Sequence, residues 1–287
     1  KMIEQKLGCF LGLAIGDAVG ATLEFMTRDT IDEVVDMEGG GVHDLKPGQW
    51  TDDTSMALCL AYSLVEKGYD VNDQLERYLK WYETGYCSSK RYCFDIGITT
   101  KLSLLDYKKN KNIEAKYSEQ SAGNGALMRI APLVMYFAFP PEQRDSLYRM
   151  AIFAKQSSRA THNNVISDDC CAYFSIILNK ALNKVKKEDL IKLEDFERKL
   201  LDIRSSEIKP IIDEHIFLKQ SRDEIKSTGY VIDSLNAALW CFYNTNSFKD
   251  AILKATNHAG DSDTIATVCG MLAGAYYGVN NNPQEWI

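Results

Sequence analysis

Two short acidic clusters with nearly the same pattern lie far apart in the sequence, Thr51-Asp52-Asp53-Thr54 and Asp261-Ser262-Asp263-Thr264. Each stands immediately before a long apolar stretch with helical spacing, so each is expected at the N-terminus of a helix. Carboxylates and hydroxyls are hard oxygen ligands, which suit Mg²⁺ or Mn²⁺ better than zinc or copper. If the fold brings the two helix ends together, the carboxylates form a binuclear metal site.

Helix capping is a simpler interpretation of either cluster taken alone. Asp and Thr at a helix start accept hydrogen bonds from free backbone amides and complement the helix dipole. Two carboxylates one or two positions apart, however, repel each other unless a cation or solvent compensates for their charge. Because the pattern occurs twice, with threonine closing both clusters, metal binding is the favoured hypothesis.

The composition is that of a soluble globular protein, with 45% hydrophobic and 25% charged residues among 287. No linker, low-complexity tract or tandem repeat divides the chain, so we expect one domain over residues 1–287. The net charge of −7 and the lack of a basic block argue against a nucleic-acid partner. A phosphorylated small molecule remains compatible with this charge, because bound metal ions supply local positive charge.

The cysteines and the N-terminal sequence indicate the cellular compartment in which the protein is expected. The eight cysteines form no CxxC pair, and several lie in apolar helical patterns, which indicates buried free thiols in a reducing compartment. The first residues lack a signal-peptide pattern, and we find no run of about 18 apolar residues that would span a bilayer. We therefore expect a cytoplasmic protein without a membrane partner.

Helical periodicity dominates the chain, starting with a first helix around residues 3–18, whereas alternating strand patterns are scarce. The other stretches with this periodicity are 55–66, 73–82, 95–105, 125–137, 145–157, 167–183, 231–243, 248–257 and 264–277. An all-α single domain is the fold that this pattern predicts.

Glycine recurs every fourth residue in the first and last of these helices. The positions are Gly8, Gly12, Gly16 and Gly20, and again Gly270, Gly274 and Gly278. A glycine inside a helix costs about 1 kcal/mol relative to alanine, so a repeated ridge requires a packing reason. Since a glycine face lets another backbone approach closely, we expect the first and last helices to share one crowded core.

Further candidate residues lie outside the two clusters. Glu24 follows the first helix. Beside a metal pair it would bind a metal ion or activate a water molecule, although a surface glutamate is the simpler interpretation. Gly123-Asn124-Gly125 forms a flexible turn at the head of a helix, where backbone amides can bind a phosphate and Arg129 can add positive charge. For His162 and Tyr230 a structural role is the default and a substrate contact the alternative. Asp17, between glycines on an apolar helix, suits a buried hydrogen-bonding role at least as well as a catalytic one.

In this order, these segments resemble the ADP-ribosylglycohydrolase family, and in particular its dinitrogenase-reductase-activating glycohydrolase branch. The resemblance runs along nearly the whole chain, from Gly12-Leu13-Ala14-Ile15-Gly16-Asp17-Ala18 to Gly274-Ala275-Tyr276-Tyr277-Gly278. The motifs that carry it are Gly48-Gln49-Trp50-Thr51-Asp52-Asp53-Thr54, Phe94-Asp95-Ile96-Gly97, Asn124-Gly125-Ala126-Leu127-Met128-Arg129, Gly229-Tyr230-Val231-Ile232-Asp233-Ser234-Leu235 and Gly260-Asp261-Ser262-Asp263-Thr264.

The resemblance implies an orthogonal helical bundle with two Mg²⁺ or Mn²⁺ ions in a central cleft. The implied catalytic residues are Asp95, near the scissile bond, and Glu24, beside the metals. The implied metal ligands are Thr51, Asp52, Asp53, Asp261, Asp263 and Thr264. The implied substrate-binding residues are Gly123, Asn124, Gly125, Met128, Arg129, His162 and Tyr230, the last of these by the adenosine.

The implied activity is metal-dependent hydrolysis of the N-glycosidic bond of an ADP-ribosylated protein side chain, chiefly arginine, with ADP-ribose as product. Three alternatives stay open: hydrolysis of serine- or O-acetyl-linked ADP-ribose, a phosphoesterase, or an inactive ADP-ribose-binding relative. The chain departs from the branch at Lys90-Arg91-Tyr92, where a Thr-Gly pair is frequent, so the leaving-group rim is expected to differ. It also has His258-Ala259-Gly260 for a common Leu-Gly-Gly, which is expected to bring an imidazole near the metals.

Overall fold

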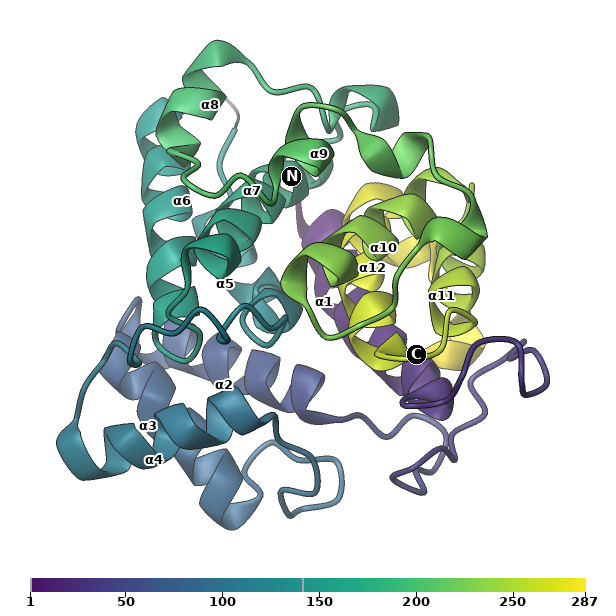
Figure 1. Cartoon of the computed structure of the whole chain (residues 1–287), viewed down its shortest axis with the longest axis horizontal. Coiled ribbons are helices and arrows are strands. Elements are labelled where there is room, and N and C mark those ends of the chain that lie inside the picture. The colour runs from purple at the N-terminus through teal and green to yellow at the C-terminus, as the bar shows by residue number, and fades with distance from the viewer. Residues whose placement is uncertain (1, 141) are drawn as a thin grey trace.

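Helices make up the regular structure of the computed structural model, which describes residues 2–140 and 142–287 (Figure 1). Within that part of the chain, strand-like pairing is limited to two isolated bridges, Gly40 with Leu45 and Gly123 with Tyr230. The prediction of an all-α fold is confirmed. The α-helices are α1 (Ile3–Gly20), α2 (Asp52–Lys67), α3 (Val71–Thr84), α4 (Ile98–Asn110), α5 (Ala131–Phe137), α6 (Arg144–Arg159), α7 (Val165–Leu182), α8 (Asp195–Leu201), α9 (Lys209–Ile212), α10 (Val231–Tyr243), α11 (Phe248–Thr256) and α12 (Ser262–Tyr277).

The first and last α-helices lie side by side within the fold. Figure 1 shows α1, in purple, beside α12, in yellow, with α10 and α11 next to α12. Helices α5, α6 and α7 pack together on one side, and α2, α3 and α4 follow one another on another. Helix α12 is buried along almost its whole length, which explains why its sequence is apolar on every face.

The glycine ridges join α1 to α12 in an antiparallel pair. A Cβ atom placed on Gly12 would lie 2.1 Å from the carbonyl oxygen of Gly270, and one placed on Gly8 would lie 2.3 Å from that of Gly274. Near the other end of the pair, Ser262 Oγ donates to the Gly20 carbonyl at 2.6 Å. The expected close packing of the first and last helices is confirmed, and it sets the C-terminal end of α1 against the N-terminus of α12.

Replacing Gly12 with alanine is expected to destabilise the protein by about 2–3 kcal/mol, because the helices must separate to admit a methyl group. The melting temperature should fall by about 5 °C or more in a thermal unfolding experiment. Gly97 is the matched control, since a Cβ there would have its nearest neighbour at 3.9 Å. Equal losses from the two alanine variants would contradict the packing role of the ridge.

Helix α1 corrects one sequence-based prediction. Together with the following turn, the segment Ile3–Leu23 is long and apolar enough, by length and composition, to cross a membrane. Polar residues such as Lys6 and Asp17 interrupt the apolar residues of this segment, so it is apolar on average without containing an uninterrupted apolar run. In the structure 67% of the apolar window is buried inside the protein, as in the core helix of a globular fold.

Candidate active site with a carboxylate cluster

The N-termini of α2 and α12 meet, which brings the two acidic clusters into direct contact. Thr264 Oγ1 donates to Asp53 Oδ2 at 2.7 Å, and Thr51 Oγ1 lies 3.1 Å from Asp263 Oδ2. The expectation that the two helix ends come together is confirmed. The reason is the ridge contact between α1 and α12, together with the anchoring of α2 on α1 through Asp17.

Asp17 accepts hydrogen bonds from the backbone amides and the hydroxyls of both Thr51 and Thr54, at 2.7 to 3.1 Å. The carboxylate is fully buried, and burial raises the pKa of Asp17 to about 6 although these hydrogen bonds lower it. Asp17 therefore fixes the start of α2 on the end of α1. Of the two roles left open by the sequence, the structure gives it the buried hydrogen-bonding one.

The carboxylates are crowded closely enough to share cations. Among the residues that the structure describes, four groups of three side chains each place one ligand atom per residue within 4.8 Å of the others. The groups are Asp17 with Asp53 and Asp263, Asp52 with Asp95 and Asp263, Glu24 with Asp261 and Asp263, and Glu24 with His43 and Asp95.

The electrostatics of the cluster fit a divalent metal. Burial raises the pKa values of Asp52, Asp53 and Asp263 well above their ordinary value, and repulsion from neighbouring carboxylates adds to this. Asp263 Oδ1 is buried without a hydrogen-bond partner in the described part of the chain. A buried acceptor of this kind is costly unless a cation or a donor satisfies it. The donors are mainly oxygen atoms, which is the ligand chemistry of Mg²⁺ and Mn²⁺.

His43 joins Glu24 to Asp95 at the rim of the cluster. Its Nε2 atom lies 3.1 Å from Glu24 Oε2 and 3.3 Å from Asp95 Oδ2. Hydrogen bonds to Asp95 and then to Glu24 raise the pKa of His43 to about 10. Burial raises the pKa of Glu24 to about 7, against the lowering effect of His43. Sequence analysis missed His43, and the one local signal was the glycine run immediately before it.

Most of the predicted site residues line one cavity of about 280 Å³. It is lined by Glu24, Phe25, Asp52, Asp53, Asp95, Gly97, Ile98, Thr99, Thr100, Gly123, Asn124, Gly125, Met128, His162, Asp261, Asp263 and Thr264. Thr51 is fully buried outside this lining. A second hollow of about 570 Å³ shares Ile98 and Thr99 with the cavity and continues along Ser118 and Ser121.

The Gly123-Asn124-Gly125 turn is docked against the carboxylates. Asn124 Nδ2 donates to Asp261 Oδ2 at 2.7 Å and to Ser234 Oγ at 2.8 Å. Gly125 packs against the ring of His162 so closely that a Cβ would lie 2.6 Å from its Cε1 atom. The turn therefore supplies a surface of backbone and amide groups next to the acidic residues.

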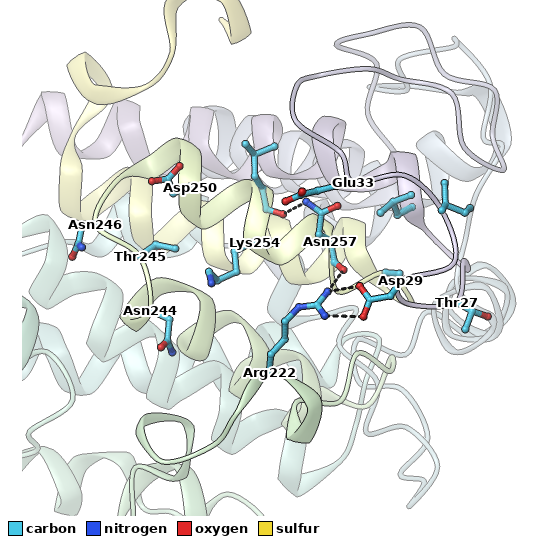
Figure 2. Close-up of a pocket in the computed structure, with 14 residues that line it drawn as sticks. Thr27, Asp29, Glu33, Arg222, Asn244, Thr245, Asn246, Asp250, Lys254 and Asn257 are labelled. Carbon is cyan, nitrogen blue, oxygen red and sulfur yellow. Dashed lines mark hydrogen bonds and ion pairs between the residues drawn. The ribbon is translucent and has the colours of Figure 1, made fainter.

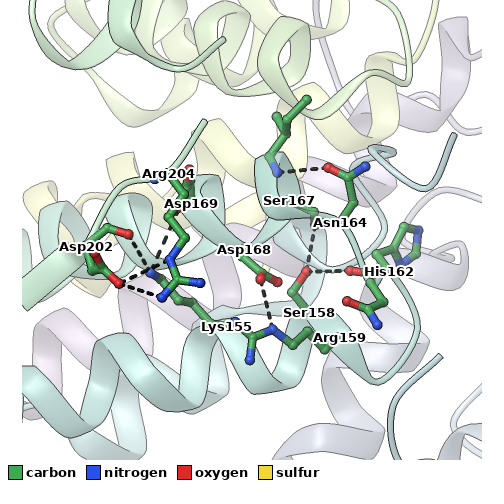
Figure 3. Close-up of polar contacts among 12 residues, drawn as sticks. Lys155, Ser158, Arg159, His162, Asn164, Ser167, Asp168, Asp169, Asp202 and Arg204 are labelled. Carbon is green, nitrogen blue, oxygen red and sulfur yellow. Dashed lines mark hydrogen bonds and ion pairs between the residues drawn. The ribbon is translucent and has the colours of Figure 1, made fainter. Parts of the chain in front are cut away.

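His162 is held at the cavity as a neutral ring. Burial lowers its pKa to about 3, and its Nδ1 atom hydrogen-bonds Thr161 Oγ1 at 2.8 Å. Figure 3 shows the support behind it: Ser158 Oγ lies within hydrogen-bonding distance of the His162 carbonyl, at 3.0 Å, and of Ser167 Oγ, at 2.7 Å. The ring therefore presents a fixed, uncharged face to the cavity.

Two predicted substrate contacts lie outside the cavity lining. Arg129 has no exposed surface; its guanidinium donates to the carbonyls of Gly125 at 3.1 Å and Ser157 at 2.9 Å, and packs over the Tyr78 ring. This position does not support direct contact with a phosphate, because helix packing turns the side chain into the core, where it braces the glycine turn. Tyr230 is half-buried at the start of α10, where its backbone pairs with Gly123.

His258 also differs from expectation. It is fully buried, hydrogen-bonds the Lys254 carbonyl at 2.8 Å through Nδ1, and packs edge-on against Trp240. It belongs to none of the potential metal-binding groups among the described residues. The turn after α11 directs its imidazole into the core instead of toward the carboxylates.

A larger hollow of about 650 Å³ is lined by Thr27, Asp29 and Glu33 of the segment that follows Glu24, by Arg222, and by residues of α11 and its flanking turns (Figure 2). Its most prominent polar groups are paired with protein partners. Arg222 holds Asp29 through two bonds of 2.8 and 2.9 Å, and the Asn257 side chain bonds both backbone polar groups of Val34. We therefore assign the chemistry to the smaller cavity, where the carboxylates converge.

Comparison with known proteins supports the resemblance that the sequence motifs indicate. The family model for ADP-ribosylglycohydrolase matches residues 2–287. The ADP-ribosylarginine hydrolase Tri1 of Pseudomonas putida (strain GB-1) is 41% identical over 288 residues, which cover 99% of this chain and 74% of the relative. The ADP-ribosyl-[dinitrogen reductase] glycohydrolase of Rhodospirillum rubrum is 33% identical and is covered over 89% of its length, with 99% of this chain aligned.

A solved structure described as an ADP-ribosylglycohydrolase-related protein complex superimposes with a TM-score of 0.84 and 38% sequence identity. The match covers 100% of this chain and 92% of that one. The fold, the nearly complete family match and the identity to these relatives agree. The chain belongs to the ADP-ribosylglycohydrolase family.

Proposed function

We propose that the protein is a metal-dependent hydrolase that removes ADP-ribose from modified arginine side chains of proteins. The observation that carries the proposal is the convergence of two aspartate pairs, Glu24 and Asp95 on one small cavity. The names of the relatives from Pseudomonas putida and Rhodospirillum rubrum support the same class of reaction. The partner would be an ADP-ribosylated protein, and free ADP-ribose the product.

In this proposal two Mg²⁺ or Mn²⁺ ions are held by Asp52, Asp53, Asp261 and Asp263, with the hydroxyls of Thr51 and Thr264 beside them. When bound, divalent cations supply positive charge and Lewis acidity next to the reacting sugar. The fit rests on the oxygen donors, the unpartnered Asp263 Oδ1 and the repulsion among buried carboxylates.

Glu24 and Asp95 have different positions and so take different tasks. The Glu24 side chain is 4% exposed and lies within reach of Asp261 and Asp263, so it accepts the proton of the attacking water. The Asp95 side chain is 19% exposed and lies at the rim, where it bonds the guanidinium group that leaves. Water oxygen joins the anomeric carbon, the carbon–nitrogen bond breaks, and the proton that Glu24 takes from the water is returned to the departing nitrogen, with Asp95 assisting this transfer beside the leaving group. Both carboxylates stabilise the positive charge that develops on the sugar.

The remaining groups suit the nucleotide part of the substrate. The Gly123–Gly125 turn offers the backbone amides of its two glycines for a diphosphate, because the Asn124 side chain is engaged with Asp261 and Ser234, and neutral His162 borders the turn without adding charge. The neighbouring hollow, which shares Ile98 and Thr99 with the cavity, extends the site in one direction. A ribose in the cavity and a nucleoside diphosphate along the hollow would together account for ADP-ribose.

The proposal is tested by incubating the protein with an ADP-ribosylarginine-containing protein and separating the products by chromatography. We expect release of free ADP-ribose, an approximately 100-fold or greater loss of rate with a chelator, and recovery with Mg²⁺ or Mn²⁺. Release of AMP or phosphate would instead indicate a phosphoesterase. Serine-linked and O-acetyl-linked ADP-ribose in parallel reactions identify the preferred linkage, and binding of ADP-ribose without turnover of any of them would contradict hydrolase function.

The cytoplasmic location is a further proposal. It rests on the eight cysteines, all of which are free thiols and most of which are buried. Free thiols persist in a reducing compartment. Cell fractionation with a tagged chain would test it, and recovery outside the cytoplasmic fraction would contradict it.

A further inference from the structure

His43 contacts both carboxylates to which the proposed function gives a catalytic task, yet its side chain is not part of the cavity lining. We propose that His43 is a positioning residue that holds Glu24 and Asp95 at a fixed separation. Glu24 is then oriented toward the attacking water while Asp95 is oriented toward the leaving group. The inference rests on the proposed function and adds a residue to it. His43 acts through the two carboxylates and does not touch the substrate.

The contact uses one oxygen of each carboxylate. His43 Nε2 faces Glu24 Oε2 at 3.1 Å and Asp95 Oδ2 at 3.3 Å. Among the described residues, no side chain or backbone group donates a hydrogen bond to the second oxygen of either carboxylate. Because both residues line the cavity, these second oxygens are left for the reacting groups. A single nitrogen between the two carboxylates therefore sets their spacing and leaves one oxygen of each carboxylate free to contact the reacting groups.

The loop that carries His43 is attached to the segment before Glu24. Thr22 Oγ1 donates to the Gly39 carbonyl at 2.9 Å. Gly41 has a φ of +71° and packs so tightly that a Cβ would lie 2.5 Å from the Ala21 carbonyl oxygen. The loop is closed by paired backbone bonds between Gly40 and Leu45 of 2.7 and 3.0 Å. The position of His43 relative to Glu24 is thus built into the backbone.

The same loop is attached to the segment before Asp95. Lys90 Nζ donates to the carbonyl of His43 itself and lies over the Phe94 ring at 5.1 Å. Phe94 and Phe25, the direct neighbours of Asp95 and Glu24, flank the imidazole edge-on, with ring centroids 5.3 and 6.4 Å away. These aromatic contacts limit rotation of the ring. His43 therefore connects two chain segments through their backbone, their aromatic side chains and their carboxylates.

The consequence is a specific kinetic signature. Without His43 the two carboxylates would repel each other and rotate apart, while the metal-binding aspartates and the glycine turn stay in place. Loss of a residue that orients a catalytic group typically costs 10- to 100-fold. We expect that loss in kcat, with KM and the dissociation constant for the product ADP-ribose within about threefold of wild type, since ADP-ribose carries no leaving group.

The test compares His43→Ala with His43→Gln, because the glutamine amide has two N–H groups that can bond the two carboxylates. His43→Ala should lower kcat on arginine-linked ADP-ribose by about 10- to 100-fold, and His43→Gln should recover most of it. The control is His215→Gln, since His215 bonds only the Ile191 carbonyl, outside the cavity. Product affinity by calorimetry and thermal unfolding are measured on all variants.

Each outcome is informative. A kcat of His43→Ala within twofold of wild type would overturn the positioning role, as would an equal loss in the alanine and glutamine variants. A fall in melting temperature and product affinity that accounts for the lost rate would show a structural role instead.

Long-range ¹H–¹⁵N spectra add a measurement that does not depend on activity. The His43 Nε2 signal should shift in both the Glu24→Gln and the Asp95→Asn variants, and a shift in neither would overturn the contact. A wild type inactive on arginine-linked ADP-ribose would overturn the proposed function, and the positioning role of His43 with it.

Discussion

Replacing both Asp261 and Asp263 with asparagine is expected to abolish ADP-ribose release, with a loss of about 1000-fold or more. In the described part of the chain, the two side chains contribute to three of the four potential metal-binding groups, and Asp263 has a buried oxygen without a hydrogen-bond partner. Asparagine keeps the shape of the side chain but removes the charge that a divalent cation requires. The measurement is initial rate at saturating Mg²⁺ or Mn²⁺, with far-ultraviolet circular dichroism to verify the helical fold.

The same variant should be more stable than wild type when both are free of metal at pH 7. Burial and neighbouring carboxylates raise the folded-state pKa of Asp263 above its unfolded value, so the ionised group opposes folding once the pH exceeds that unfolded value. The stabilisation by asparagine should therefore shrink as the pH falls and disappear below about pH 4, where the carboxyl becomes protonated in the unfolded state as well. Added metal should raise the melting temperature of wild type but not of the variant.

Asp250→Asn is the matched control for this prediction. Asp250 is also an acidic residue in the first turn of a helix, α11, but it lies outside the carboxylate cluster. It should leave the rate and the metal-dependent rise in melting temperature unchanged. Full activity of the double variant would refute a metal site at the two helix ends.

Replacing Asp95 with asparagine is expected to lower kcat on arginine-linked ADP-ribose by about 100-fold or more, the usual range for loss of a group that assists proton transfer. Asp95 stands at the rim of the cavity, where a departing guanidinium would pass. The metal-dependent rise in melting temperature should persist, because Asp53, Asp261 and Asp263 remain. Single-turnover rates on the modified protein and thermal unfolding with Mn²⁺ measure the two effects separately.

Glu83→Gln serves as the control for the loss of one carboxylate, since Glu83 pairs with Lys108 on the surface. An Asp95 variant with full turnover would remove the role assigned to Asp95 and leave the metal site unaffected. An Asp95 variant that also loses the response to Mn²⁺ would show that Asp95 is a metal ligand. That outcome has a structural basis, because one potential group joins Asp95 to Asp52 and Asp263.

Much of the fold follows from spacing that is local in the sequence. Helical periodicity predicted most of the α-helices, although not the short α8 and α9, because the burial of one face of a helix depends on residues three and four positions apart. The glycine ridges predicted the pairing of α1 with α12, since the loss of helix stability caused by each glycine is offset only by close contact between backbones. From that pairing the meeting of the two acidic clusters follows, because they flank the ends that the ridges bring together.

Long-range partners were less accessible to the sequence. The orientation of Arg129 depends on which face of its turn meets Tyr78 and Ser157, and no local pattern specifies that. For Asp17 the sequence left two roles open, and its four hydrogen bonds to the start of α2 select one. His258 was expected near the metals on adjacency alone, and the turn before α12 sends it into the core.

The types of ligand, the helices that present them and the family could thus be read from residues that are neighbours along the chain. The contact of His43 with Asp95 and Glu24 could not be read from the sequence. His43 follows a loop of three glycines with positive φ, and the course of this loop is set by contacts with other segments. Residue types and short spacings specify what a site can bind. Which side chains orient its reactive atoms depends on distances between segments that meet only when the chain is folded.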